Sequence, residues 1–118
     1  MKVIYIAGPF NGGNAWEVEK NIRKAEELSL QVWEMGAAAI CPHTNTRHFH
    51  GVLRSEEWLN GYLEILRRCD AVLTVPTWQS SPGARAEIAR AGDLGIPVFD
   101  TAARLKIWVR GSMQPRNY

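Results

Sequence analysis

One carboxylate lies where an amphipathic helix should be apolar. Residues 80–87 read Ser-Ser-Pro-Gly-Ala-Arg-Ala-Glu, in which Ser81 and Pro82 have the form of a helix start. On a helical wheel that begins at Ala84, Glu87 falls inside the apolar arc formed by Ile88, Ala91 and Leu94. An acid on such a face is either hydrogen-bonded or functional. Because helical side chains tilt toward the N-terminus, we expect Glu87 to point back at the glycine turn.

The start of this helix is also a candidate anion site. Gly83 leaves the neighbouring amides open to a ligand, and a helix start of this kind binds anions, phosphate above all. Glu87 has a structural interpretation as well, as an edge carboxylate paired with Arg90, which would contribute about 0.2–0.5 kcal/mol. The wheel alone leaves both interpretations open.

The elements that must position these residues follow an alternating pattern. Short apolar runs alternate with helical patterns, which predicts an α/β domain with a parallel sheet of four to five strands and helices on both faces. We expect strands at 3–7, 37–41, 71–75 and 95–99, and helices at 14–36, 55–68, 83–94 and 101–109. Ligands bind beyond the carboxyl ends of such strands, so one cleft should be shared by the loops 8–14, 42–54 and 76–83.

Composition limits the possible classes of protein. The chain has 118 residues, of which 46% are hydrophobic, enough for one compact domain. Its net charge of +2 makes nucleic acid an unlikely partner, and it has no apolar run of the ~18–20 residues that a membrane span needs. Two cysteines without a targeting segment favour a reduced, cytoplasmic setting. We expect a body of residues 1–100, followed in 101–118 by a short helix and a basic C-terminal tail.

Two motifs, taken together and in order, carry a resemblance to a known family. Residues 5–13 read Tyr-Ile-Ala-Gly-Pro-Phe-Asn-Gly-Gly, and Ser81-x-Gly83-x-x-x-Glu87 follows later. Over roughly residues 2–99 the chain resembles the nucleoside 2-deoxyribosyltransferase superfamily, which includes the 2′-deoxynucleoside 5′-phosphate N-hydrolases. Small, often phage-borne relatives look more similar still, which would place the protein in a host cytoplasm. The resemblance implies a flavodoxin-like, Rossmann-like fold.

The resemblance also implies a reaction and roles for residues. A glutamate, here Glu87, attacks the anomeric carbon of a 2-deoxyribosyl group and releases the base, and water or a second base resolves the glycosyl-enzyme. Tyr5 matches the tyrosine that holds this carboxylate, and Ser81 matches the serine with which the hydrolases bind a 5′-phosphate. The implied substrate-binding residues are Gly8, Pro9, Phe10, Asn11, His43, Trp78, Ser81, Gly83 and Ala84. Relatives form homo-dimers or larger homo-oligomers.

The chain departs from the family pattern at two positions. Tyr62 stands where the family has an auxiliary aspartate, and Asn11 stands where the hydrolases have a phosphate-binding arginine. Arg47 and Arg54, in the long loop, are candidates to replace that arginine.

Histidines and tryptophans near the cleft invite two further interpretations. The pairs Cys41-x-His43 and His48-x-His50 lack the spacing of structural zinc sites, so we expect no metal and no cofactor. Trp16, Trp58 and Trp78 adjoin the cleft loops and could stack on a base, whereas Trp33 and Trp108 are expected in the core or at a subunit interface.

We therefore expect cleavage or transfer of the N-glycosidic bond of a 2′-deoxynucleoside or its 5′-monophosphate. One alternative is a non-catalytic nucleotide-binding or sensing module that retains the anion-binding helix start. Another is a docking protein that uses the basic tail and the tryptophans. The sequence does not identify the base or distinguish hydrolysis from transfer.

Overall fold

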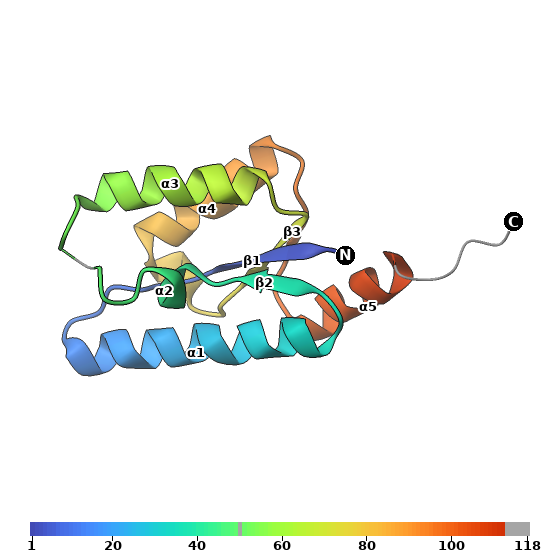
Figure 1. The fold of residues 1–118 in the computed structure, drawn as a ribbon, viewed down its shortest axis with the longest axis horizontal. Coiled ribbons are helices and arrows are strands. Elements are labelled where there is room, and N and C mark those ends of the chain that lie inside the picture. The colour runs from blue at the N-terminus through green and yellow to red at the C-terminus, as the bar shows by residue number, and fades with distance from the viewer. Residues whose placement is uncertain (50, 113–118) are drawn as a thin grey trace, which may run out of the picture.

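The computed structural model describes residues 1–49 and 51–112, and its centre is a parallel sheet of four strands (Figure 1). The strand order is β2-β1-β3-β4. The strands are β1 (Val3–Ala7), β2 (Ala38–Ile40), β3 (Ala71–Thr74) and β4 (Val98–Phe99). In the centre of the sheet, Tyr5 pairs with Ile40 on one side and with Val72 on the other.

The helices of the described residues begin at recognisable sequence signals. They are α1 (Ala15–Glu34), α2 (Pro42–Asn45), α3 (Ser55–Arg67), the 3-10 turn η1 (Trp78–Ser80), α4 (Pro82–Asp93) and α5 (Ala102–Ser112). The Asn14 side chain accepts the Glu17 amide at 2.9 Å and so caps α1. Ser81 caps α4 in the same way, accepting the Ala84 amide at 3.2 Å.

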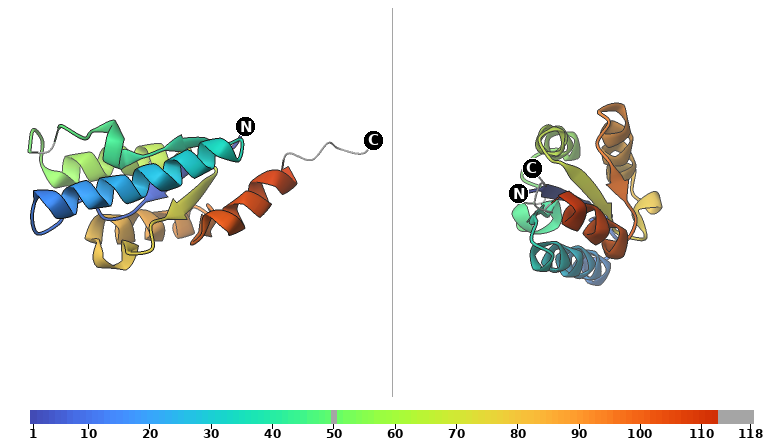
Figure 2. Two further views of the ribbon diagram at one scale, coloured as in Figure 1. Left: turned by 90° about the horizontal axis from the view of Figure 1, so that it is seen from below. Right: turned by 90° about the vertical axis from the view of Figure 1, so that its right-hand side faces the viewer.

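Helices cover both faces of the sheet (Figure 2). On one face, α1 and α5 bury Ile4 and Ile6 of β1 together with Val32, Leu73, Leu105 and Val109. On the other face, α3 and α4 bury Tyr5 and Ala7 together with Tyr62, Leu66, Val72 and Ala91. This alternation along β1 is the period of two that a strand imposes, and it directs Tyr5 toward α3 and α4.

The expected fold class is confirmed, with four strands, and the differences are local. The strand expected at 95–99 contains only two strand residues, because Gly95 takes a left-handed conformation (φ +70°) and the Ile96 amide bonds to the Ala91 carbonyl at the end of α4. The loop 42–54 contains α2, which has Pro42 at its first position. The last helix extends to residue 112, and residues 113–118 of the expected tail lie outside the described residues.

Candidate functional site

A cavity of about 540 Å³ opens where the strands end at their carboxyl side. Its walls come from the loops after β1, β2 and β3 and from the starts of α3 and α4. The lining residues are Gly8, Pro9, Phe10, Asn11, Pro42, His43, Thr46, Ser55, Glu56, Trp58, Leu59, Tyr62, Ser80, Ser81, Pro82, Gly83, Ala84 and Glu87. This is the size of a small-molecule site.

Glu87 lies in the wall of this cavity and is joined to Tyr5. The Tyr5 hydroxyl on β1 donates a hydrogen bond to Oε2 of Glu87, whose side chain is 8% exposed. Burial raises the pKa of Glu87 to about 7, although the Tyr5 hydrogen bond acts in the opposite direction by favouring the ionised form. The carboxylate is therefore buried and hydrogen-bonded to β1, which differs from the edge position that an ion pair with Arg90 would require.

Tyr5 is suited to remain a neutral donor. Its side chain is fully buried. Burial, and next the negative charge of Glu87, raise the pKa of the Tyr5 hydroxyl far above its usual range. The phenol thus keeps its proton and shares it with the carboxylate.

The start of α4 forms another part of the wall. The Gly83 amide belongs to the first turn, which has no intrahelical acceptor for it. A Cβ built on Gly83 would have only the Ser81 Oγ nearby, at 3.9 Å, so the backbone is open to a ligand on this side. Ser81 uses its hydroxyl oxygen to accept the Ala84 amide.

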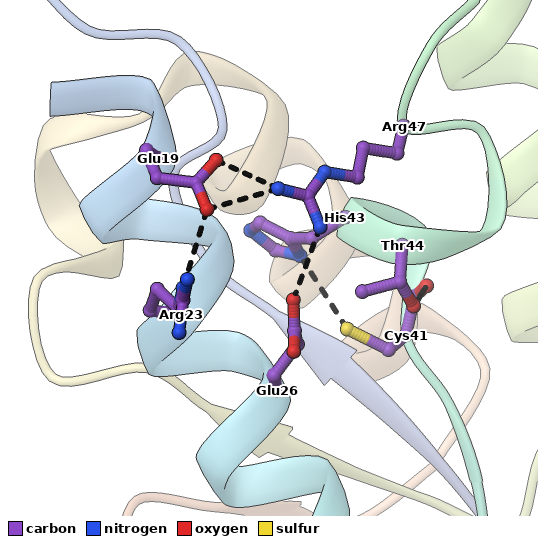
Figure 3. Close-up of polar contacts among 7 residues, drawn as sticks. All are labelled: Glu19, Arg23, Glu26, Cys41, His43, Thr44 and Arg47. Atoms are coloured by element: carbon purple, nitrogen blue, oxygen red, sulfur yellow. Dashed lines mark hydrogen bonds and ion pairs between the residues drawn. The ribbon is translucent and has the colours of Figure 1, made fainter. Parts of the chain in front are cut away.

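His43 links α2 to the loop after β1. Its side chain is 3% exposed, and Nε2 donates to the Pro9 carbonyl at 2.9 Å. Nδ1 faces Sγ of Cys41 (Figure 3), and the two atoms lie 4.0 Å apart. Burial lowers the pKa of His43 and raises that of the Cys41 thiol, so both groups stay neutral at physiological pH. His43 fixes the loop that carries Pro9 and Phe10.

The two arginines that were candidates to replace the phosphate-binding residue are engaged elsewhere. Arg47 donates to both carboxylate oxygens of Glu19, at 2.9 and 2.8 Å, and lies 3.6 Å from Glu26 (Figure 3). Arg54 is exposed and lies 3.4 Å from Glu56. Neither lines the cavity, and among the described residues no lysine or arginine does.

Tyr62 belongs to the cavity wall through its hydroxyl. The hydroxyl oxygen lies 2.8 Å from Oγ1 of Thr46 and 3.3 Å from the Pro42 carbonyl, and it accepts the Asn45 side-chain amide at 3.2 Å. Sequence analysis missed this attachment of α3 to α2. The spacing of Ser55, Leu59 and Tyr62, on one stripe of a helix that begins beside the cleft, is the signal that could have revealed it.

The predicted binding residues are mostly brought together. Eight of these residues line the cavity, and their binding roles remain predictions. They are Gly8, Pro9, Phe10, Asn11, His43, Ser81, Gly83 and Ala84. Trp78 does not line the cavity, although Ser80, the last residue of the same turn η1, does.

The other tryptophans are divided between wall, surface and core. Trp58 lines the cavity and stacks on Phe49, with ring centroids 6.0 Å apart. Trp16 is 67% exposed outside the cavity. Trp33 is 55% exposed, so it does not lie in the core, and its alternative place at a subunit interface stays a prediction. Trp108 packs against the core beside Phe99.

Residues 1–49 and 51–112 contain neither a cluster of metal-ligating side chains nor a membrane-spanning helix. In these residues, no three histidine, cysteine or acidic side chains lie close enough together to bind a metal ion. His50, which belongs to the His48-x-His50 pair considered as a zinc motif, lies outside the described residues. No helix within the described residues is long and apolar enough to cross a membrane.

Comparison with known proteins identifies the family. The model of the family described as Domain of unknown function (DUF7768) matches residues 2–101. The chain belongs to the DUF7768 family. A search of curated protein sequences finds no match.

Solved structures share the fold of this DUF7768 chain. It is similar to a 2-deoxyribosyltransferase from the psychrotolerant bacterium Bacillus psychrosaccharolyticus, with a TM-score of 0.64 and 18% identity over 98% of each chain. It is also similar to the solution structure of BlsM, with a TM-score of 0.63 and 22% identity over 93% of this chain and 73% of that one. These similarities establish the fold relationship.

Proposed function

We propose that the protein cleaves or transfers the N-glycosidic bond of a 2′-deoxynucleoside or its 5′-monophosphate through a glycosyl-enzyme on Glu87. The observation that carries this proposal is the buried Tyr5–Glu87 pair in the wall of the cavity. A carboxylate with a fixed donor behind it and a ligand-sized space in front of it has the arrangement of a nucleophile.

The reaction has two halves. In the first, a Glu87 carboxylate oxygen forms a bond to C1′ of the sugar, the C1′–N bond breaks, and the electron pair leaves with the base. In the second, water or another base attacks C1′ and returns the electron pair to the carboxylate. The Tyr5 hydroxyl supports both halves, because its hydrogen bond favours the ionised Glu87 that begins and ends the cycle.

Similarity to a 2-deoxyribosyltransferase supports the substrate class. The wall also suits the parts of a nucleoside, since Trp58 and Phe10 offer aromatic surface for a base and Asn11 offers hydrogen bonds. A 5′-phosphate would have the start of α4, at Ser81 and Gly83, as its partner.

A second candidate function is a non-catalytic nucleotide-binding or sensing module. The observation in its favour is the pKa of Glu87 near 7, which leaves part of the population protonated at neutral pH. A neutral carboxyl group is a hydrogen-bonding partner for a base rather than a nucleophile.

Incubation with the 2′-deoxynucleosides and their 5′-monophosphates separates the two candidates. Chromatography detects free base, and intact mass detects a glycosyl adduct. We expect base release by the wild type, none by Glu87→Ala or Glu87→Gln, and unchanged release by Asp93→Asn, which removes an exposed acid from the same helix. Nucleotide-dependent thermal stabilisation without base release, retained by Glu87→Gln, would favour the sensing module instead.

A further inference from the structure

Glu56 is a second carboxylate in the wall of the same cavity. It lies in the first turn of α3, whereas Glu87 lies on α4, and both helices cover the same face of the sheet (Figures 1 and 2). We propose that Glu56 is the general base that activates the incoming nucleophile in the second half of the reaction. This inference rests on the proposed function.

The other ionisable groups of the wall are already engaged. Within the described residues these are His43, whose Nε2 donates to Pro9 and whose Nδ1 faces Cys41, and Tyr62, whose hydroxyl is held by α2 and Thr46. Glu87 itself is esterified at this stage of the cycle. Besides Glu87, Glu56 is the other carboxylate of the described wall, and its partner, the Arg54 guanidinium at 3.4 Å, is itself exposed.

The two carboxylates differ in their access to water. The side chain of Glu56 is 68% exposed, and its carboxylate lies 3.4 Å from the Arg54 guanidinium, whereas Glu87 is 8% exposed. The nucleophile of the second half enters from solvent, and Glu56 offers an exposed carboxylate in the wall of the cavity that it enters. A buried acid is suited to hold the sugar, and an exposed acid is suited to receive a proton and release it.

The step balances without any further reactant. As the oxygen of water bonds to C1′, its proton passes to a carboxylate oxygen of Glu56. The ester bond from C1′ to Glu87 breaks, and its electron pair returns to the Glu87 carboxylate. Glu56 then releases the proton to solvent. In transfer, the proton comes from a ring nitrogen of the acceptor base instead.

Glu57 provides a matched control on the same helical turn. It is also acidic and also near Arg54, at 3.7 Å, but it does not line the cavity. Its Oε2 accepts the Arg54 amide at 2.9 Å at the start of α3, and a glutamine oxygen can accept the same amide. Glu56→Gln and Glu57→Gln therefore each remove one negative charge from the first turn of α3, but only Glu56 lines the cavity.

Rapid-quench kinetics with the 2′-deoxynucleosides and their 5′-monophosphates test the inference. We expect Glu56→Gln to release the first base and form the Glu87 adduct at the wild-type rate, but to hydrolyse the adduct about 10²- to 10⁴-fold more slowly. Azide, which attacks without losing a proton, should restore turnover in Glu56→Gln. Glu57→Gln should stay within about twofold of the wild type in both halves.

Three results would overturn the inference. Wild-type adduct hydrolysis in Glu56→Gln, or an equal loss in Glu57→Gln, removes the role from Glu56 and leaves the proposed function standing. Slow adduct formation in Glu56→Gln, without rescue by azide, assigns Glu56 to substrate binding rather than to proton transfer. Absence of both adduct and free base in the wild type overturns the proposed function and this inference with it.

Discussion

The hydroxyl of Tyr5 on β1 donates a hydrogen bond to the carboxylate of Glu87 on α4, across 82 positions of sequence. The donor is immobile, because β1 is paired on both sides and the Tyr5 side chain is fully buried. Burial of Glu87 favours its protonated form, and the hydrogen bond favours its ionised form. This opposition sets the pKa of Glu87 close to neutrality, where ionisation can control both activity and stability.

Removal of the Tyr5 hydroxyl should move the pH dependence of the proposed reaction. In Tyr5→Phe, the pKa of Glu87 should rise further above 7, because burial remains and the favourable hydrogen bond is lost. The rising limb of the pH–rate profile should move to higher pH. The rate at pH 7 should fall about fivefold for the first increase of one in this pKa and about tenfold for each further increase. At high pH, where Glu87 is ionised in both proteins, the rates of Tyr5→Phe and of the wild type should converge. An unchanged profile would show that Tyr5 does not act through the ionisation of Glu87.

Glu87→Gln should raise stability at alkaline pH. The pKa of this carboxyl rises from 4.5 in the unfolded chain to about 7 in the native protein, so between these values the native state holds a proton that the unfolded state has lost. The free energy of unfolding therefore falls as pH rises from 4.5 to 7, by about 3 kcal/mol in total.

Glutamine has no such titration, so the variant should exceed the wild type in stability above pH 7 and lose this advantage below pH 4.5. Denaturant unfolding at about pH 4, 6 and 8 measures the difference. Wild-type and Glu87→Gln curves that stay parallel across this range would mean that the carboxyl is ionised without cost in the native protein.

The features that sequence could predict depend on short-range rules. The alternation of Ile4, Tyr5 and Ile6 places Tyr5 on the face opposite its neighbours, and the Ser81–Pro82 pair fixes where α4 begins. The position of Glu87 on the inward arc follows from the start of its helix. Together these rules direct Tyr5 and Glu87 toward each other.

The features that sequence could not predict depend on contacts between distant elements. Arg47 is a candidate phosphate ligand by its position in a cleft loop, but Glu19 and Glu26 of α1 lie within reach and pair with it. Likewise, by its resemblance to the 2-deoxyribosyltransferases the sequence would have an aspartate at position 62, yet Tyr62 stands there and its hydroxyl is held by α2, a helix inside the segment expected to be a loop. Only the packing of these elements decides such pairings.

Gly8 should be required for the close approach of β1 and β3 at the edge of the cavity. A Cβ built on Gly8 would lie 2.6 Å from the Cβ of Val75 and closer still to Cγ2. Gly8→Ala should therefore lower the free energy of unfolding by about 1–3 kcal/mol through overpacking. Gly13→Ala, in the same loop with nothing within 4 Å, is the control and should change it by less than about 0.5 kcal/mol. Equal effects of the two substitutions in urea unfolding would contradict this role.

Tyr62 and Thr46 should contribute to stability as a pair, because their hydroxyl oxygens lie 2.8 Å apart between α3 and the residue that follows α2. Tyr62→Phe and Thr46→Val should each lower the free energy of unfolding by about 0.5–1.5 kcal/mol. The double variant should lose less than the sum, with a coupling energy of about 1 kcal/mol.

Urea unfolding of the wild type, Tyr62→Phe, Thr46→Val and the double variant measures this coupling energy. Tyr62→Asp, which introduces the aspartate expected from the resemblance to 2-deoxyribosyltransferases, should cost more than either single change, about 3–5 kcal/mol, because Tyr62 is 9% exposed and packs beside Leu66. Additive losses in the double variant would mean that the two hydroxyl groups act independently. A Tyr62→Asp protein as stable as Tyr62→Phe would mean that the ring itself contributes little, and the acid could then be introduced there without loss of the fold.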